Sequence, residues 1–316
     1  MKNFILKTPE ETRCSSYMEL THYATKFKKS KSTITLKKMI TNKYIYLRYL
    51  LLISMLCHGL TSCSVTKDQK EKNSSLKYKL VFEDQFKGDA YNPKFWGSYQ
   101  SKSGKSPWNK YVIDDADLAK VKNGHLHMRA RWNPKTDLPE TGAIQTKDKF
   151  SFKYGKIEVK AKFNSVGQGG WPAIWLMPQN DIYSGWPNGG EIDIMERLNN
   201  DNFVHQVIHQ SNGEAKHISK GKTPAISPTD YNTYGIIKLP NRIEFYVNNE
   251  LTMVHEPKDD FAKRWPFETD YYIILNYACA DKGQSGVYFW PGNVTSTTNF
   301  PYEMMVDYVK VWEYVE

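Results

Sequence analysis

The segment from Gly189 to Asn200 reads GGEIDIMERLNN and brings three acids together in an otherwise apolar run. On a helix, Glu191 and Glu196 would point about 140° apart at roughly 100° per residue, so a helix would scatter the acids. On a strand, Glu191 and Asp193 share one face because side chains alternate with period two. One extra residue, a β-bulge within 194–195, returns Glu196 to that face. The segment therefore predicts a bulged strand with three acids side by side.

Three carboxyls on one strand face suit glycoside hydrolysis. Two glutamates about four strand steps apart have Cα atoms roughly 13 Å apart. Side chains that lean inward bring the carboxyls near the ~5 to 5.5 Å of a retaining glycosidase, where one attacks the anomeric carbon and the other exchanges the proton. A third acid ~6 Å away repels its neighbours by roughly 3 kcal/mol, about two pKa units. We expect a coupled set that keeps one proton near neutral pH.

The plainer interpretation of alternating acids is a solvated sheet face. The preceding segment GGWPAIWLMP, from Gly169 to Pro178, speaks against it, because a solvated face does not require this concentration of Trp and Pro. In this region the chain resembles glycoside hydrolase family 16, in particular its laminarinase-like branch with a bulged ExDxxE motif. The matching segments, in the family's order, are LVFEDQF (80–86), VKNGHLHMRA (121–130), TGAIQTKDKFSFKYGKIEVKAKF (141–163), GWPAIWLMP (170–178), GGEIDIMER (189–197) and MMVDYVKVW (304–312).

The resemblance implies an all-β, two-sheet β-sandwich, a jelly roll with a substrate cleft across its concave face. It implies that Glu191 is the nucleophile, Asp193 the assisting acid and Glu196 the general acid/base. The residues support the fold independently. Gly155 to Phe163 alternates charged with apolar side chains as a half-buried strand does, and Arg242 to Glu256 predicts a hairpin that turns at two asparagines.

Aromatic residues supply candidate sugar contacts, since Trp offers a large apolar surface with an electron-rich face. By match to the family's segments, Trp171 and Trp186 are expected at sugar subsites, and Trp108 with Asn109 at another. Core packing is the alternative for each of them. Trp175 has the same parity as Trp171, and we assign it to the core.

His205 and His209 lie four residues apart on the next predicted strand and would share a face. Such a pair could indicate a metal site, but no third ligand has suitable spacing, so we expect no metal in the catalytic site. We interpret His209 instead as a polar neighbour of Glu196. No cofactor is expected. The family often binds a structural calcium near its first motif, and Gln85 replaces the usual acid there, so calcium binding stays open.

The segment 275–292 departs from the family's glucanase-like pattern, and Trp290 within it is a candidate sugar contact that could alter substrate choice. We expect an endo-acting retaining β-glycoside hydrolase that cleaves a polysaccharide, with β-1,3 or mixed β-1,3/1,4-glucan as the leading substrate. An endo-β-galactosidase acting on galactans, agars or mucin-type galactose chains is the alternative. A surface glycan-binding protein without catalysis is a second alternative, against which the intact acid set argues.

The formal charge of +9 lies mainly at the start of the chain: residues 1–62 hold 11 Lys/Arg and 3 Asp/Glu, a net charge of +8, which leaves +1 for the remainder. The near-neutral remainder does not favour a nucleic-acid partner. Residues 1–38 are interpreted as an upstream extension or disordered tail. Residues 39–62 have the positive and apolar regions of a secretory signal, and the segment that ends at Cys63 resembles a bacterial lipobox.

The sequence therefore predicts a lipid-anchored, extracytoplasmic protein held at the outer membrane or cell surface through Cys63. Residues 63–76 form a polar tether, and residues 77–316 form the family 16 catalytic domain, which we expect to be monomeric. Only Cys63 and Cys279 would remain after cleavage of the signal, and lipid would occupy the first, so no disulfide is expected within the domain.

Overall fold

The computed structural model describes residues 77–99, 106–180, 182–214, 216–283 and 290–315. The expected signal peptide, Cys63 and the tether lie outside these residues. The regular elements of the described residues are strands and two short 3-10 helices, η1 (Pro107–Asn109) and η2 (Asp259–Ala262). Among these residues, no helix has the length and apolar character that crossing a membrane requires.

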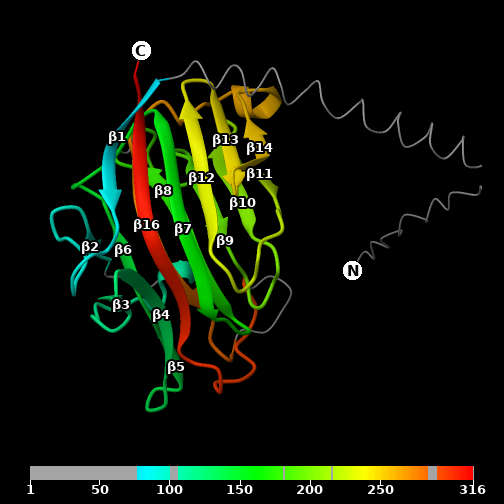
Figure 1. The fold of residues 1–316 in the computed structure, drawn as a ribbon. Helices are drawn as coiled ribbons and strands as arrows, with labels where there is room; N and C mark the ends of the chain where they lie inside the picture. The colour runs from blue at the N-terminus through cyan, green and yellow to red at the C-terminus, as the bar shows by residue number, and fades with distance from the viewer. Residues whose placement is uncertain (1–76, 100–105, 181, 215, 284–289, 316) are drawn as a thin grey trace, which may run out of the picture. The chain divides into compact units, whose positions relative to one another are not determined.

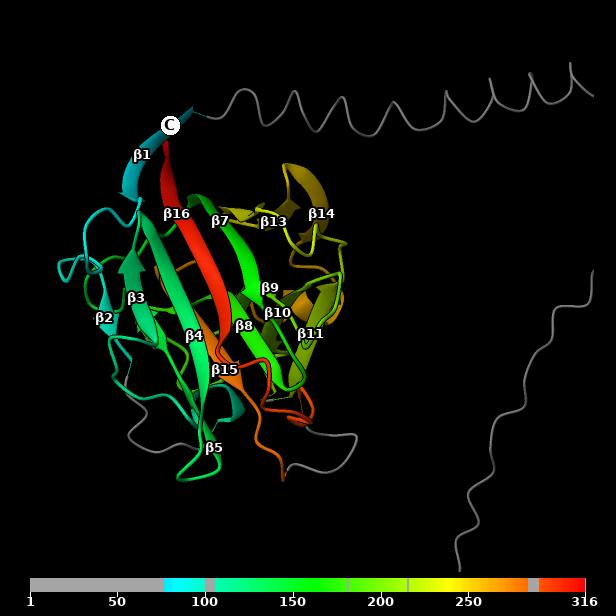
Figure 2. The same cartoon turned by 60° about the horizontal axis from the view of Figure 1, so that its bottom comes forward.

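One sheet has nine strands and forms the front layer in Figure 1. Its strands are β1 (Lys77–Asp84), β3 (Ala119–Lys122), β4 (His125–Asn133), β5 (Leu138–Thr141), β7 (Gly155–Ser165), β12 (Asn232–Leu239), β13 (Arg242–Val247), β14 (Glu250–His255) and β16 (Tyr302–Val315). The order is β14-β13-β12-β7-β16-β4-β3, with β1 also paired to β16 and β5 to β4. Figure 2 shows β1, β16 and β7 as neighbours in this layer.

The other sheet has seven strands in the order β11-β10-β9-β8-β15-β6-β2. Its strands are β2 (Gly97–Ser98), β6 (Ala143–Gln145), β8 (Gly170–Pro178), β9 (Glu191–Glu196), β10 (His205–Ser211), β11 (His217–Lys222) and β15 (Tyr271–Cys279). Each pairing between these strands is antiparallel. The acid strand β9 lies inside the sheet, hydrogen-bonded on both edges, so its backbone is fixed by β8 and β10.

The main core lies between the two sheets. Ile157 and Val159 of β7 meet Ile192 and Ile194 of β9 in one continuous apolar cluster, and all four are fully buried. Each such side chain contributes roughly 1.5–3 kcal/mol by leaving water. A second, smaller cluster covers the opposite, outer face of the seven-stranded sheet and is formed by Ala173, Trp175, Tyr272 and Ile274. The seven-stranded sheet therefore has apolar side chains on both faces.

These findings confirm the predicted all-β sandwich. β7 buries every second side chain, as its alternating sequence predicted. The predicted hairpin is β13 and β14, and its turn residues Asn248 and Asn249 have φ of 52° and 65°. Both values are left-handed, as a type I′ hairpin turn requires.

Candidate active site

β9 carries one extra residue. Ile174 and Trp175 are consecutive on β8, but they face Met195 and Asp193, so Ile194 has no partner of its own. The pairing with β10 shows the same shift. Ile194 and Met195 are both fully buried in the core between the sheets. The bulge expected at 194–195 is therefore present, and it turns the acid that follows back to the outer face.

Glu191, Asp193 and Glu196 consequently line one pocket on the outer face of the seven-stranded sheet. Glu191 is partly exposed, whereas Asp193 and Glu196 are buried. The remaining walls come from η1, β8 and β15. They are Trp108, Trp171, Ala173, Trp175 and Asn276. Three carboxyls thus meet in a pocket walled largely by indole rings.

The glycine pair before β9 fixes how the chain enters the acid strand. Gly190 has φ of 78°, and a Cβ there would lie 2.8 Å from Phe267, Pro266 and the hydroxyl of Tyr271. Only glycine fits such a backbone at this distance from its neighbours. The Tyr271 hydroxyl also donates a hydrogen bond to the carbonyl of Gly189 at 2.7 Å. Glu191 therefore starts from a rigid backbone position.

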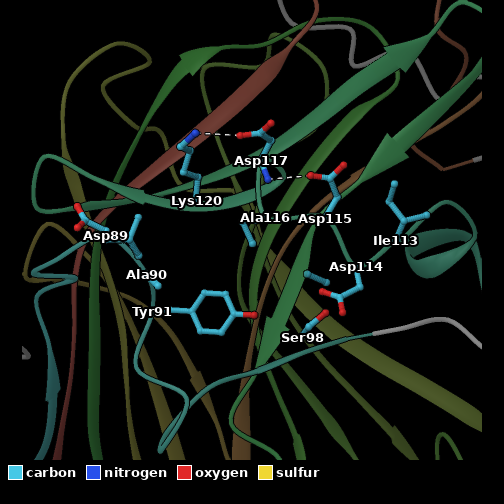
Figure 3. A pocket seen from close by; sticks show the side chains of 14 residues that line it. Asp89, Ala90, Tyr91, Ser98, Ile113, Asp114, Asp115, Ala116, Asp117 and Lys120 are labelled. Atoms are coloured by element: carbon cyan, nitrogen blue, oxygen red, sulfur yellow. Dashed lines mark hydrogen bonds and ion pairs between the residues drawn. The ribbon is translucent and has the colours of Figure 1, made fainter.

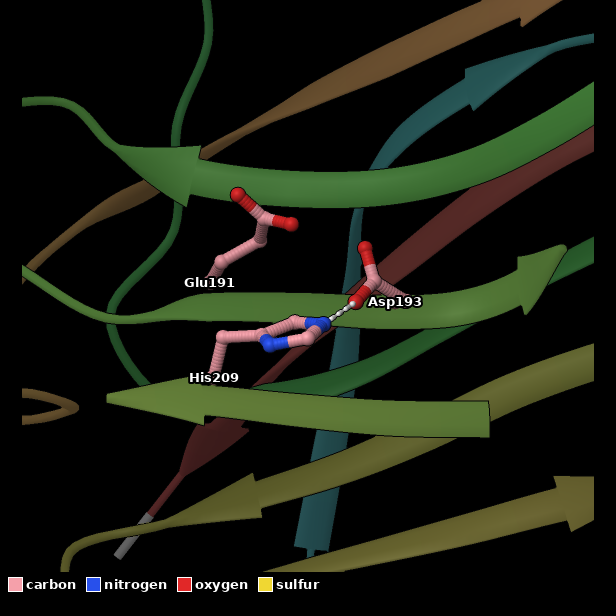
Figure 4. A group of neighbouring side chains, drawn as sticks. All are labelled: Glu191, Asp193 and His209. Carbon is pink, nitrogen blue, oxygen red and sulfur yellow. Dashed lines mark ion pairs between the residues drawn. The ribbon is translucent and has the colours of Figure 1, made fainter. Parts of the chain in front are cut away.

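Glu191, Asp193 and His209 form a tight group (Figure 4), with one side-chain atom of each lying within 4.8 Å of the others. His209 Nε2 lies 3.2 Å from Asp193 Oδ2. The Glu191 carboxyl is hydrogen-bonded to Asp193 and to Trp186. Each of the three groups therefore has a neighbour within the group.

Burial raises the pKa of all three carboxyls. The pKa of Glu191 rises to about 8, first through burial and then through the charge of Asp193. Burial raises the pKa of Asp193 to about 8 as well, opposed by its hydrogen bond to Glu191. The pKa of Glu196 is raised well above its ordinary value, through burial and then the charge of Asp193. Burial, together with the charge of Asp193, therefore favours the protonated forms of Glu191 and Glu196.

Glu196 has aromatic neighbours. Trp171 donates its indole N–H to Glu196 Oε1 at 2.8 Å. Trp290, 43% exposed, lies edge-on to Trp171 at 6.5 Å and to His205 at 4.9 Å between ring centroids. His205 is the residue of β10 that pairs with Glu196. The structure thus brings Trp171 and Trp290, two of the predicted sugar contacts, to the Glu196 end of the site.

Of the other predicted sugar contacts, two lie at the site and one does not line the pocket. Trp186, 54% exposed, lies at the Glu191 end of the site. Trp108 lines the acid pocket and packs on Trp175 with 4.8 Å between ring centroids. Asn109 is not among the lining residues, because its side chain donates to the hydroxyl of Tyr99 at 2.9 Å.

The structure corrects the interpretation of His209: its ion-pair partner is Asp193, with His209 Nε2 3.2 Å from Asp193 Oδ2. On β10, His209 pairs with Glu191, and His205, four residues away, pairs with Glu196. Trp175 is buried in a hydrophobic cluster, as expected, and it also lines the acid pocket. Its indole donates to Asn276 Oδ1 at 2.7 Å.

Asn276 and His217 lie at or beside the site, and the sequence pattern does not predict them there. Asn276 belongs to the apolar run of β15, whose residues are all buried, so alternation does not reveal which face it occupies. His217 starts the edge strand β11 and hydrogen-bonds to His209. No spacing rule links two histidines eight residues apart across a turn. Trp175 could have been assigned to the pocket, because it lies four residues from Trp171 and so on the same face of the strand.

Another pocket, away from the acid strand, also contains several acids (Figure 3). Asp115 accepts from the backbone N–H of Asp117 and pairs with Arg131, and Asp117 pairs with Lys120. These contacts tie the loop that precedes β3 to β3 and β4.

The first-motif acids, where the family often binds calcium, likewise have protein partners. Glu83 accepts from Gln85 at 2.6 Å and pairs with Lys310. Asp84 accepts from Trp96 and from the backbone N–H of Phe86. As arranged, these side chains do not fit a cation site.

A bulged strand that presents coupled carboxyls in a tryptophan-lined pocket of a β-sandwich has the groups that a carboxylate-based glycosidase requires. The comparison with family models agrees. Residues 108–309 match the model described as "Glycosyl hydrolases family 16", and the chain belongs to this family.

Characterised relatives act on different glycans. The chain is 37% identical over 246 residues to keratan-sulfate endo-1,4-beta-galactosidase of Sphingobacterium multivorum, covering 75% of this chain but only 55% of that protein. It is 29% identical over 279 residues to a beta-glucanase of Rhodothermus marinus, covering 81% of this chain and 92% of the relative. The solved laminarinase of Rhodothermus marinus superposes with a TM-score of 0.66 at 27% identity, covering 77% of this chain and all of that one.

Proposed function

We propose that the protein is an endo-acting, retaining β-glycoside hydrolase that cleaves internal linkages of a polysaccharide. The observation that carries the proposal is the placement of Glu191, Asp193 and Glu196 in one tryptophan-lined pocket, in a chain of glycosyl hydrolase family 16. The reaction uses side-chain carboxyls alone and requires no cofactor.

In this mechanism Glu196 donates its proton to the leaving oxygen, consistent with its strongly raised pKa. Glu191 attacks the anomeric carbon and forms a glycosyl-enzyme. The proton that Glu191 and Asp193 share must move away from Glu191 before attack, and Asp193, hydrogen-bonded to Glu191 and adjacent to His209, is placed to accept it. Glu196 then takes a proton from water, which releases the second product with retained configuration.

We propose β-1,3-glucan or mixed β-1,3/1,4-glucan as the substrate. The beta-glucanase of Rhodothermus marinus supports this choice, since the alignment covers 92% of that protein. A β-galactose polymer is the second candidate, favoured by the 37% identity to the keratan-sulfate galactosidase. Trp290 is exposed at the pocket edge, in the segment that departs from the glucanase-like pattern, and is a candidate determinant of the choice.

A product profile tests the proposal. Protein from residue 64 onward is incubated with laminarin, mixed-linkage glucan, agarose, keratan sulfate and a mucin-type galactose glycan, and the oligosaccharides are resolved by chromatography. Glucan oligosaccharides that appear before monosaccharides support the leading substrate, and proton NMR of the fresh products should show the β-anomer first. Products from galactose polymers alone would keep the mechanism and identify a β-galactose polymer, not a glucan, as the substrate. Binding without cleavage by wild type would favour a glycan-binding protein and overturn the enzyme proposal.

We also propose that the domain is tethered outside the cytoplasm by lipid on Cys63. The support is the sequence of residues 39–76, with its positive region, apolar region and polar tether. Metabolic labelling with a palmitate analogue should mark the wild-type protein and not Cys63→Ser. Mass spectrometry that finds unmodified residues upstream of position 63 in the mature protein would exclude the anchor.

A further inference from the structure

Two imidazoles connect the buried acid Asp193 to the edge of the sheet. His209 Nε2 lies 3.2 Å from Asp193 Oδ2, and His209 Nδ1 lies 2.9 Å from His217 Nε2. The two rings stack with centroids 5.1 Å apart and an interplanar angle of 25°. Asp193 is buried on the inner strand β9, whereas His217 is exposed on the edge strand β11. The side-chain contacts from Asp193 through His209 to His217 thus cross three adjacent strands, β9, β10 and β11.

The contacts assign the proton positions. When Asp193 is ionised, its negative charge 3.2 Å from His209 Nε2 favours a hydrogen on that nitrogen. In neutral His209 the other nitrogen, Nδ1, is then an acceptor, and His217 must donate to it from Nε2. Burial, and then the proximity of His209, lowers the pKa of His217, which keeps that imidazole neutral and able to donate in this sense. His217 therefore selects one tautomer of His209, the one that supports Asp193.

Trp186 holds the same two rings in place. Its ring centroid lies 4.8 Å from that of His217 and 6.1 Å from that of His209. Trp186 also hydrogen-bonds to Glu191. The contacts thus form a closed circuit through Glu191, Asp193, His209, His217 and Trp186. A change at His217 can therefore reach Glu191 through Trp186 and Asp193 through His209.

We propose that His217 is a positioning residue for the glycosidase reaction: its N–H fixes the tautomer and orientation of His209, and His209 thereby holds Asp193 ready to relieve Glu191 of its proton. This inference rests on the proposed function of the acid set. The ionisable groups that face His209 are Asp193 and Glu191 on β9 and His217 on β11, and Glu196 lies further along β9. His217 contributes geometry and does not touch the reacting atoms.

Three variants separate the hydrogen bond from the ring. His217→Phe keeps a ring against Trp186 and removes the donor, His217→Gln keeps a donor and removes the ring, and His217→Ala removes both. We expect His217→Phe to lose about 10-fold in kcat with KM unchanged and to show a displaced acidic limb of the pH–rate profile. His217→Gln should recover most of kcat. Equal kcat values and unchanged pH profiles for Phe, Gln and wild type would overturn the proposal. A rise in KM alone, shared by Gln and Ala, would also overturn it in favour of a sugar-stacking ring.

A measurement without substrate keeps this test separate from the proposed function. In protein labelled with ¹⁵N-histidine, NMR should show His209 as the Nε2–H tautomer in wild type and in His217→Gln, and as a mixture in His217→Phe. If wild type cleaves no polysaccharide but the tautomer changes as stated, the proposed function fails and the positioning contact stands. If His209 keeps one tautomer in all variants, His217 does not position it, whatever the activity. Because His217 lies exposed on an edge strand, thermal unfolding should be unchanged, which excludes misfolding as the cause.

Discussion

Trp171 donates its indole N–H to Glu196 at 2.8 Å, and the same ring lies edge-on to the exposed Trp290. One tryptophan therefore connects the proposed general acid to the rim where a leaving sugar would lie. The hydrogen bond lowers the pKa of Glu196, against the larger raising effect of burial.

Replacement of Trp171 by Phe removes this donor and keeps most of the ring. The pKa of Glu196 should rise further, so the basic limb of the pH–rate profile should move to higher pH. We expect kcat to fall by roughly 10-fold, because the acid loses its orienting contact. Trp132→Phe is the matched control, since its indole also donates to a carboxylate, that of Asp137 at 3.1 Å. An unshifted basic limb would contradict this role of Trp171.

The two glutamates should respond differently to the leaving group. We expect Glu191→Gln to lose about 10⁴-fold or more in kcat on every substrate, because no nucleophile remains. Glu196→Gln should lose roughly 10²–10⁴-fold on polysaccharide and far less on an aryl glycoside whose leaving group needs no proton. Steady-state rates on both substrates provide the test. Identical losses for both variants on the aryl glycoside would argue against the assigned roles.

Because the buried acids have raised pKa values, they should make the folded protein less stable as pH rises. The folded pKa of Glu191 is about 8, above the ordinary value of 4.5. Between these pH values the folded chain binds the proton more tightly than the unfolded chain, so stability falls with rising pH. Glu191→Gln removes this loss, and the variant should be more stable than wild type at pH 8 by about 1–3 kcal/mol, with a smaller difference at pH 5. Urea unfolding at the two pH values measures it. A variant that is less stable than wild type at pH 8 would contradict this effect of the buried Glu191 carboxyl.

Lys238 should affect the pH dependence of stability in the opposite direction, so that stability rises with pH. Its fully buried ammonium donates to the carbonyls of Lys153 and Thr269, and burial lowers its pKa to about 7. Between pH 7 and the ordinary value of 10.5, the unfolded chain binds this proton and the folded chain does not, so this term raises stability with pH. Lys238→Met should flatten that rise. It should also cost roughly 1–3 kcal/mol at pH 7, since two carbonyls lose their donor.

The solvent-facing Lys310→Met is the comparison for this measurement. It should leave the pH dependence of stability between pH 7 and pH 10 unchanged. The same flattening in both variants would show that the effect does not come from burial of Lys238.

The sandwich and the bulge were predictable because both follow from residue spacing. Period-two alternation indicated β7, and the misfit of Glu196 to that period required one extra residue. The partners of the acids were harder to predict, because they come from other strands and depend on register. The antiparallel pairing places His209 opposite Glu191 and His205 opposite Glu196, and the spacing of residues within one strand does not reveal this. His217 and Asn276 reach the site through pairings that the local sequence does not encode.

The bulge also has a consequence for packing. An even strand would offer one inward side chain between Asp193 and the next outward acid, whereas β9 offers two, Ile194 and Met195, both fully buried. Deleting Ile194 would leave the acids on alternate positions of an even strand, still facing outward. The deletion would instead leave a cavity between the sheets, which typically costs several kcal/mol for a side chain of this size. The inserted residue is therefore needed to fill the space between the two sheets. The length of the chain at this point is set by core packing as well as by the placement of the acids.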